Sequence, residues 1–488
     1  MMQLNSRLPQ WATHGPWAVE QLVALTCLPN VTGHRADLER NAAAIVALYR
    51  DLGVNLNTDG RFEGGPLIFG RLEVDPNAPT IGIYVHYDGQ PVGEPDWVTE
   101  PFDPVFRLND APISKDQVLS DPAGINPDLR LFGRGTADDR APLVAIAAAL
   151  RALNEVGRKP AVNLVFCFEG EEESGSPNLA QYLAANADAL AADHWWICDG
   201  PVHQSGLPQV VCGVRGYTGF ELTVYGPESE LHSGHYGNWV PNPAQLLVEL
   251  LAHCKQDGRI EIEGFDACAT PITSGDRAAI ARLPGMDAEI LDRIGVAMPE
   301  REQPLFESVL SSSFNIRGIQ SGTVGANARN IIPSTAHASV DMRLAPGVDP
   351  DVALAELVAY LEGLGYKVFD REPTPQERRT HPRLARIDRM PAYPGMRVPA
   401  DSPLVVDTAK VIAKASGIDP VILPSLGGSV PFHHLTDTLG VEAVLVPIAN
   451  HDNNQHAANE NLRIGHLGYG FDLFSTLMTY GPVGTITD

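Results

Sequence analysis

Cysteines are few in this chain, and those present are scattered. The 488 residues include six cysteines, none of them in a C-x-x-C pair: Cys27, Cys167, Cys198, Cys212, Cys254 and Cys268. A disulfide framework and a thiolate zinc site both need closely spaced cysteines. The sequence therefore indicates small buried thiols, and a metal site in this chain must use other side chains.

Long apolar runs and basic residues are also scarce. No stretch of about 18 uncharged apolar residues occurs, and no apolar run follows a basic segment near the N-terminus. Lys and Arg total 35 against 60 Asp and Glu, which gives a net charge of -25. Nucleic acids and anionic membranes attract positive surfaces, so this balance argues against both as partners. We expect a cytoplasmic protein.

Acidic side chains are what the sequence does have, and one group of them follows an apolar run. Val162–Phe166 has the β-branched and aromatic composition of a buried parallel strand, and four glutamates, Glu169 and Glu171–Glu173, come directly after it. Packed carboxylates repel one another unless a cation lies among them or they reach water. The pattern predicts a metal site, with a solvated acidic turn as the alternative.

A second apolar run ends in a histidine. Thr80–Val85 predicts a short strand that leads into His86 and Asp88. Ligands collect at the strand ends of α/β sheets, and alternation places these two side chains on the same side of an extended segment. We interpret His86 as a candidate ligand and Asp88 as the carboxylate that orients it, the alternative being a simple turn.

Two further acidic positions have similar surroundings. Asp138 and Asp139 precede the alanine-rich segment Ala141–Leu153, which predicts a helix, and one of them is expected to cap it. Asp199 follows another apolar strand near Trp195–Ile197. The glycines before Asp138 have neither the P-loop Lys-Ser/Thr nor the G-x-G-x-x-G spacing, which argues against a nucleotide site.

The order of the predicted elements indicates an α/β fold: a catalytic domain with a mixed, largely parallel sheet flanked by helices, plus an inserted α+β lid or dimerisation domain. From about residue 214, apolar and polar residues alternate as they do in antiparallel strands. We therefore expect the catalytic domain at 1–213 and 396–488 and the insertion at 214–395. Within the insertion we expect an irregular region at 271–304 and a return connection at 371–397.

Taken together, the candidate ligands suit two metal ions. The set consists of His86, Asp138, Glu172 or Glu173, Asp199 and His456. Imidazoles and carboxylates without thiolates favour zinc, manganese or cobalt, and this number of ligands is what two ions sharing one carboxylate need. One glutamate remains to move a proton from a bridging water to a leaving amine.

Six motifs carry a resemblance to a known family. They are His86-Tyr87-Asp88-Gly89-Gln90-Pro91, Gly133-Arg134-Gly135-Thr136-Ala137-Asp138-Asp139, Glu169-Gly170-Glu171-Glu172-Glu173-Ser174-Gly175-Ser176, Asp199, His232-Ser233-Gly234 and Gln455-His456-Ala457-x-Asn459-Glu460. In this order they resemble the carnosinase and cytosolic non-specific dipeptidase branch of the co-catalytic zinc peptidases. That larger family includes glutamate carboxypeptidases, aminoacylases and succinyl-diaminopimelate desuccinylase.

The resemblance implies roles for the matching residues. Asp138 would bridge two divalent metals, zinc first, with manganese or cobalt as alternatives. His86 and Asp199 would hold one ion, and Glu173 and His456 the other. Glu172 would be the general base and acid, and Asp88 would orient His86.

The resemblance also implies substrate contacts and a homodimer formed through the lid. His232 would stabilise the oxyanion in the site of the partner subunit. The expected substrate-binding residues are Asn330, Arg343, Gly427, Gly428 and Ser429. An arginine suits carboxylate recognition because its donor fork matches the two oxygens.

Some positions depart from the family pattern. Arg140 stands where Lys is frequent, Gly89 replaces a common Val, and Ser425-Leu426 replace the Arg and acid that dipeptidases place before Gly427. The segment 271–304 could shape a pocket for a bulkier acyl group. We therefore predict a dinuclear metal hydrolase of dipeptides or short peptides. An N-acyl-amino-acid amidohydrolase is the alternative, and a non-catalytic metal-binding relative is a third reading.

Overall fold

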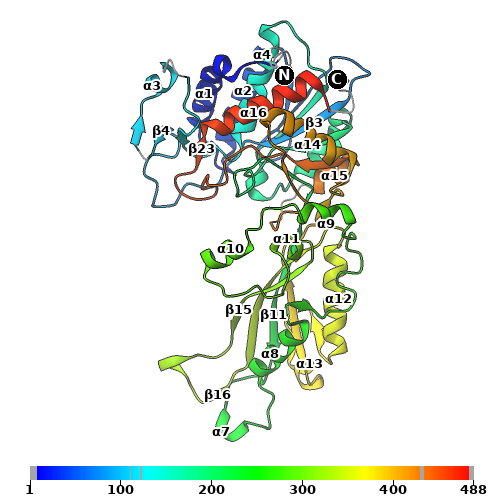
Figure 1. The fold of residues 1–488 in the computed structure, drawn as a ribbon. Coiled ribbons are helices and arrows are strands. Elements are labelled where there is room, and N and C mark those ends of the chain that lie inside the picture. Colours follow the sequence, from blue (N-terminus) through cyan, green and yellow to red (C-terminus); the bar gives the residue numbers. More distant parts are fainter. Residues whose placement is uncertain (1–7, 110, 121–123, 429–432, 483–488) are drawn as a thin grey trace.

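Strands from the two ends of the chain form one eight-stranded mixed sheet (Figure 1). The structure is a computed structural model, which describes residues 8–109, 111–120, 124–428 and 433–482. In spatial order its strands are β1 (Leu56–Asp59), β2 (Leu67–Leu72), β7 (Asn163–Glu169), β3 (Thr80–His86), β8 (His194–Ile197), β22 (Glu442–Leu445), β9 (Gln209–Val211) and β21 (Val421–Leu423). The four central strands, β7, β3, β8 and β22, run parallel. Their carboxyl ends therefore meet at one edge of the sheet.

Helices cover both faces of this sheet. On one face, α4 (Arg140–Glu155) contacts α1 (Trp11–Thr26) and α16 (Ile464–Tyr480), and α16 contacts α14 (Pro403–Ser416). Most of α4 is fully buried, as its run of alanines and leucines predicts, and α2 (Arg35–Asp51) packs into the same core. The other face carries α5 (Leu179–Ala185), α6 (Ala187–Leu190) and α15 (His433–Leu439).

A smaller four-stranded sheet joins distant parts of the chain beside the main one. Its order is β23 (Asn461–Arg463), β6 (Arg130–Phe132), β4 (Val105–Leu108) and β5 (Ala111–Ile113). The antiparallel pair Asn461–Phe132 places the loop before β23 next to the loop after β6. These two loops carry His456 and Asp138, two of the predicted ligands.

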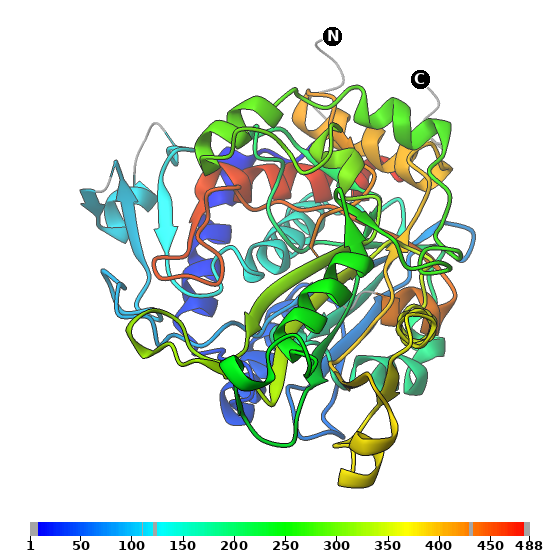
Figure 2. The ribbon, with the colours of Figure 1, turned by 90° about the horizontal axis from the view of Figure 1, so that it is seen from below.

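The middle of the chain forms a second body, which we call the lid (Figure 1). Its five-stranded sheet has the order β15 (Ser313–Gln320), β17 (Thr335–Leu344), β11 (Gly216–Tyr225), β19 (Leu384–Arg389) and β18 (Lys367–Phe369). Alternate residues of β17 are buried, as period-two patterning predicts. They pack with α8 (Pro243–Cys254) and α12 (Pro350–Gly363) into a separate core. Seen from below, the end of the lid lies in front of the larger body (Figure 2).

The predicted fold class is confirmed, while two expectations for the lid were wrong. The region 271–304 is not irregular, because it contains α9 (Ser274–Ile280) and α10 (Asp287–Ile294). The return connection contains α13 (Pro375–Thr380) and the strand β19, which pairs directly with β11. Arg386 and Asp388 occupy the outward positions of β19 and alternate with buried Ala385 and Ile387, so the charge of this segment obscured its alternation.

The chain passes between the two bodies at two neighbouring points. The short strands β10 (Gly213–Val214) and β20 (Met396–Arg397) form an antiparallel pair there. The domain boundaries predicted nearby, at 213/214 and 395/396, stay predictions. Among the residues that the structure describes, no helix is both long and apolar enough to span a lipid bilayer.

Candidate metal centre

The predicted ligands come from five separate segments that end at one edge of the main sheet. His86 is the last residue of β3, and Asp199 lies two residues beyond β8. Glu173 belongs to a short 3-10 helix after β7, at Glu172–Ser174. Asp138 precedes α4, and His456 lies in the loop before β23. Parallel strands thus bring together side chains that are far apart in the sequence.

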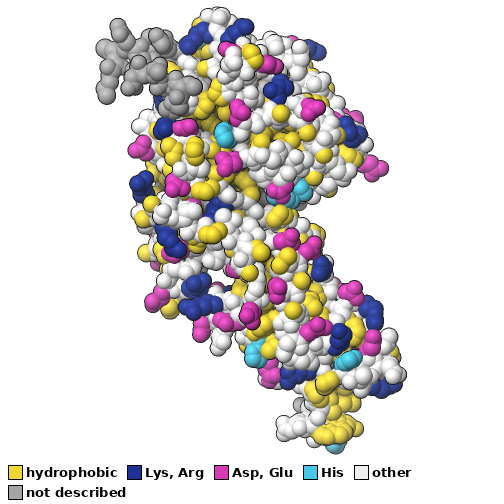
Figure 3. Space-filling view, turned by 90° about the vertical axis from the view of Figure 1, so that its right-hand side faces the viewer, with side chains coloured by type: hydrophobic (Ala, Val, Ile, Leu, Met, Phe, Trp, Pro, Cys, Tyr) yellow, Lys and Arg dark blue, Asp and Glu magenta, His cyan; other side chains and the backbone are white. Residues whose placement is uncertain are grey.

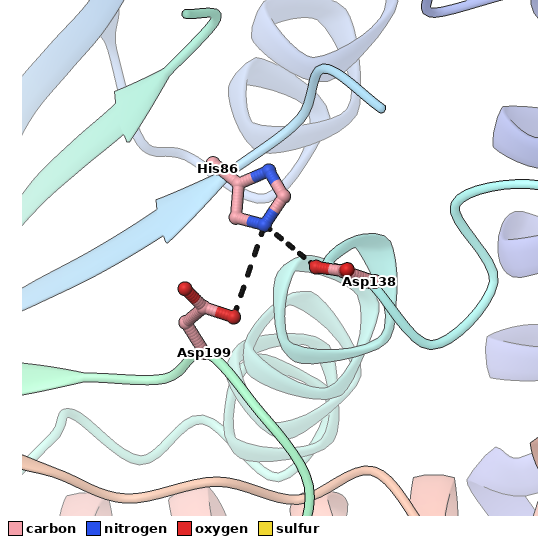
Figure 4. A group of neighbouring side chains, drawn as sticks. All are labelled: His86, Asp138 and Asp199. Carbon is pink, nitrogen blue, oxygen red and sulfur yellow. Dashed lines mark hydrogen bonds and ion pairs between the residues drawn. The ribbon is translucent and has the colours of Figure 1, made fainter. Parts of the chain in front are cut away.

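One group of three side chains gathers around His86 (Figure 4). Its Nε2 lies 2.8 Å from Oδ1 of Asp138 and 3.9 Å from Oδ1 of Asp199. The ring and the Asp138 side chain are almost fully shielded from solvent, and Asp199 is only slightly more exposed. The three ligand atoms lie within 4.8 Å of one another, close enough for a single cation to contact all of them.

A second group shares Asp138 with the first. His456 Nε2 lies 3.1 Å from Oδ2 of Asp138 and 3.2 Å from Oε2 of Glu173. The two oxygens of Asp138 therefore face different groups, one toward His86 and one toward His456. This is the arrangement that a carboxylate shared by two cations requires.

The charges of the two groups fit cations. Burial raises the pKa of Asp199 to about 6, with the neighbouring carboxylates of Asp138 and Glu173 adding to the effect. Burial likewise raises the pKa of Glu172 well above its usual range. Hydrogen bonds with Asp138 and Glu173 raise the pKa of His456 to about 10. A divalent cation in each group would offset the repulsion among these buried carboxylates, so oxygen and nitrogen donors of this kind fit zinc, manganese or cobalt.

Asp88 connects His86 with the acidic segment. Its carboxylate is fully buried, lies 3.4 Å from His86 Nδ1 and accepts the backbone N–H groups of Glu172 and Glu173, both at 3.2 Å. The geometry is consistent with the predicted orienting role and adds the positioning of Glu172 to it. The peptide between Asp138 and Asp139 is cis.

Two further side chains support the ligands, and the sequence analysis gave them no role. Glu460 is completely buried and accepts N–H groups from the backbone of Gly135, Ala137 and Asp138 at 3.0–3.1 Å. It also accepts a hydrogen bond of 3.0 Å from Arg134. Gln90 donates to Oε2 of Glu173 at 2.7 Å. Glu460 lies four positions after His456 and Gln90 four after His86, so both were near a recognised ligand, but nothing in the sequence showed their partners.

The predicted lid residues do not gather in one place. His232 ends β12 (Leu231–His232) and is exposed, and Ser233 N donates to the carbonyl of Asn330 at 3.0 Å. Both residues adjoin α7 (Ser233–Tyr236) and β16 (Ile331–Ile332), which lie at the far end of the lid, away from the main sheet (Figure 1). Within one chain, His232 and Asn330 are therefore remote from the two ligand groups.

Arg343 lies at the opposite end of the lid sheet from Asn330. It is near the end of β17 that adjoins the crossing between the bodies, and its guanidinium lies 5.1 Å from the centre of the Tyr217 ring. The prediction gave both Asn330 and Arg343 as substrate-binding residues. The structure separates them by almost the length of β17, so one chain does not bring them to the same ligand.

The glycine loop of the main body is tied to the lid. Arg215 Nε and Nη2 donate to the carbonyl of Gly427 at 2.9 and 2.6 Å, and its backbone N–H donates to Gly428 at 3.3 Å. The third predicted residue of this loop, Ser429, lies outside the described residues.

Tyr393 is a further residue near the site that the sequence analysis missed. Burial raises the pKa of its phenol, which also lies within the influence of the charges of Arg343 and Glu172. Its ring stacks on that of His433, with centres 5.8 Å apart, and is tilted against that of Tyr217, at 5.9 Å. Tyr393 lies in the segment interpreted as a connection, where composition gave no sign of a functional side chain.

Comparison with known proteins identifies the family. The profile of peptidase family M20/M25/M40 matches residues 82–480. The chain belongs to this family. It is 26% identical over 435 residues to a Cys-Gly metallodipeptidase of Schizosaccharomyces pombe, covering 88% of this chain and 85% of the relative. It is 25% identical over 452 residues to the Beta-Ala-His dipeptidase of Mus musculus, covering 90% and 85%. The crystal structure of an M20 family metallo-carboxypeptidase from Sulfolobus solfataricus superposes with a TM-score of 0.74 at 25% identity, covering 96% and 99%. The resemblance to the dipeptidase branch of the metallopeptidases is thus confirmed.

Proposed function

We propose that this M20 peptidase is a dinuclear metal-dependent hydrolase that cleaves the amide bond of dipeptides. The observation that carries the proposal is Asp138, whose two carboxylate oxygens face two separate ligand groups. Relatives that match most of the chain are named as a metallodipeptidase and a dipeptidase, which supports the dipeptide as substrate class.

The proposed ligands divide between two ions. His86 and Asp199 would hold one, Glu173 and His456 would hold the other, and Asp138 belongs to both groups. Zinc is the proposed metal, with manganese and cobalt as the alternatives that the same donors accept. When bound, such ions supply a Lewis acid for the scissile carbonyl and lower the pKa of a water molecule.

Glu172 is the proposed proton carrier. Its backbone N–H donates to Asp88, and burial, with a contribution from the carboxylates of Asp199 and Glu173, raises the pKa of its side chain. A raised pKa suits a group that takes a proton from the attacking water and then delivers it to the departing amine. Deprotonation of the water and protonation of the amine thus use one carboxylate in succession.

His232 is proposed to act from a second copy of the chain. An imidazole N–H donated to the carbonyl oxygen would stabilise the charge that develops there during attack. In one chain His232 directly precedes α7, which lies at the far end of the lid (Figure 1), so a homodimer formed through the lid would place His232 in the partner's site. Asn330 lies beside His232 and would come with it. Arg343, Gly427 and Gly428 would bind the substrate from the chain that carries the metals.

The first experiment measures metal content together with amide hydrolysis. The protein is chelated and then restored with zinc, manganese or cobalt. Each form is assayed against dipeptides and N-acyl amino acids, which separates a peptidase from an acylase. We expect two ions per chain and metal-dependent cleavage of dipeptides.

A matched pair of variants controls this measurement. Asp138→Asn should lose both ions and all turnover, because both groups share this carboxylate. Asp452→Asn should retain them, because Asp452 pairs with Arg130 in a partly exposed position. Full activity of the chelated protein would contradict the proposal.

A further inference from the structure

A cavity of about 660 Å³ lies at the base of the lid. Its walls come from α10, α11 (Leu305–Ser308), the start of β15 and the hairpin of β13 (Lys255–Gln256) and β14 (Arg259–Ile260). Its apolar lining includes Ile290, Leu291, Ile294, Leu305, Val309 and Phe314. Charged residues also line it, namely Lys255, Asp287, Glu300, Arg301 and Glu302, but the apolar wall is large enough to accommodate a large apolar group.

The cavity extends to the glycine loop of the main body. Arg215 lines it and at the same time donates two hydrogen bonds to the carbonyl of Gly427. Val309 also lines it, and a Cβ built on Gly427 would lie 3.3 Å from Val309 Cγ1. One end of the cavity is therefore formed by the side chains that touch the proposed substrate-binding loop.

Two guanidinium groups lie near this end. Ser313 lines the cavity and is the direct neighbour of Arg343 in the sheet, with Arg343 N–H donating to its Oγ at 3.4 Å. Burial lowers the pKa of Arg215 to about 10, and the nearby charge of Arg343 contributes to this. Asp341 offsets part of the positive charge of the two guanidinium groups, since its carboxylate lies 3.8 Å from Arg343 Nε. Paired guanidinium groups of this kind favour a carboxylate ligand.

We propose that the cavity accepts the side chain of the substrate's C-terminal residue while Arg215 and Arg343 face its carboxylate, so that the enzyme selects large apolar C-terminal residues. The inference rests on the proposed function. It follows from connectivity, because the carboxylate and the side chain of that residue share one Cα. A residue whose carboxylate faces these arginines therefore has its side chain within reach of the cavity.

The test compares two dipeptides with the metal-loaded protein, alanyl-phenylalanine and alanyl-glycine. We expect kcat/KM to favour the phenylalanine substrate by at least about tenfold, because one methylene in an apolar pocket already gives roughly 10- to 200-fold discrimination. Val309→Trp and Leu291→Trp, which fill the cavity from two sides, should each reduce this ratio about tenfold or more.

We expect Leu291→Trp to fold, since none of the residues of α10, all of them described, is fully buried. Val296→Trp is the matched control. Val296 is 45% exposed next to α10 and does not line the cavity, so the ratio should stay at its wild-type value. An unchanged ratio in both cavity variants, or no preference in the wild type, would overturn the inference.

A binding measurement separates this inference from the proposed function. Calorimetry compares N-acetyl-phenylalanine with N-acetyl-glycine on the same metal-loaded protein, and it needs no turnover. Tighter binding of the phenylalanine compound, lost in Val309→Trp, would support the cavity even if no dipeptide were cleaved. Equal binding of the two compounds would reject the cavity even if dipeptides were cleaved.

Discussion

The edge of the main sheet with the proposed metal ligands and the far end of the lid both carry proposed catalytic groups, but in different surroundings. At the sheet edge, side chains from five segments converge and most are buried, and buried partners such as Asp88 and Glu460 hold them. At the end of the lid, His232 is exposed. Trp239 and Val324 nearby are 78% and 88% exposed, and hydrophobic side chains gather at this end (Figure 3).

The difference concerns whether one chain supplies all the groups that each of these two places needs. Buried ligands with fixed partners can bind metal without help from another molecule. An exposed histidine beside exposed apolar side chains lacks such support, and exposed apolar patches mark surfaces that bind another molecule. We therefore expect variants at the sheet edge to act within their own chain, and variants at the end of the lid to act on a partner.

The largest effect is expected for Glu172→Gln. Removing a general acid and base typically lowers kcat by about 10²- to 10⁴-fold, while metal content should stay unchanged because Glu172 is outside both ligand groups. Kinetic assays measure kcat, and elemental analysis measures the metal content. Glu171→Gln is the control: Glu171 belongs to the same acidic run but bonds to Asn178, and its loss should leave kcat near wild type. Normal turnover in the Glu172 variant would remove Glu172 from the mechanism.

His232→Ala tests whether the end of the lid serves a partner. Loss of an oxyanion donor typically lowers kcat by about 10²- to 10³-fold. Mixing this variant with Glu172→Gln should then restore about a quarter of wild-type activity, since half of randomly formed dimers contain one intact site. The neighbouring His235→Ala should have a much smaller effect. If the mixture stays inactive although the two chains exchange, His232 does not act across subunits.

Glu460→Gln tests how far the buried sheet edge depends on a residue that holds the segment of Asp138. A neutral amide cannot accept the three backbone N–H groups and Arg134 equally well, so the Asp138 segment should be held less firmly. Such supporting residues typically contribute about 10- to 100-fold to metal affinity. Competition with a chromogenic chelator measures this. Glu94→Gln is the matched control, because Glu94 pairs with the same Arg134 at 3.1 Å but accepts no N–H of this segment. Equal affinities for the two variants would show that Glu460 only balances the charge of Arg134.

The smallest effect concerns Glu169, a buried carboxyl hydrogen-bonded to Tyr84. Burial raises its pKa from 4.5 to about 8. The folded protein therefore holds this proton more tightly than the unfolded chain, and stability is lost as pH rises from about 4.5 to 8. In Glu169→Gln the fall in Tm between pH 6 and 8 should be smaller than in the wild type by roughly 3 °C. If calorimetry gives parallel curves of Tm against pH for the variant and the wild type, the carboxyl of Glu169 is not held protonated in the folded protein.

Sequence reasoning brought four of the five proposed ligands to one edge of the sheet because each of them stands next to a recognisable signal. His86 and Asp199 come after apolar strands, Glu173 after another, and Asp138 before an alanine-rich helix. Parallel strands then place these ends together, so local patterns were sufficient. The same reasoning failed where position depends on pairing between distant segments. Glu460 acts through backbone groups of another loop, and Tyr393 stacks across the crossing between the bodies.

The lid was harder to predict for related reasons. Its strand β19 carries charges on its open face, and α10 has no fully buried residue, so the burial patterns that identify strands and helices were weak there. The separation of Asn330 from Arg343 depends on the length of β17 and on which end faces the main body. Neither can be obtained from a motif.

The paired crossing at β10 and β20 has a consequence for how this architecture can change. β9 and β21 are adjacent parallel strands joined through α14, so the lid interrupts what is otherwise an ordinary strand–helix–strand unit. Because its entry and exit are hydrogen-bonded to each other, the insertion closes on itself, and doubling the length of a flexible insertion costs only about 0.6 kcal/mol of closure entropy. Segments can be added to or removed from the lid without changing the register of the main sheet. A lineage can thus remodel which substrates it admits while its metal ligands keep their places.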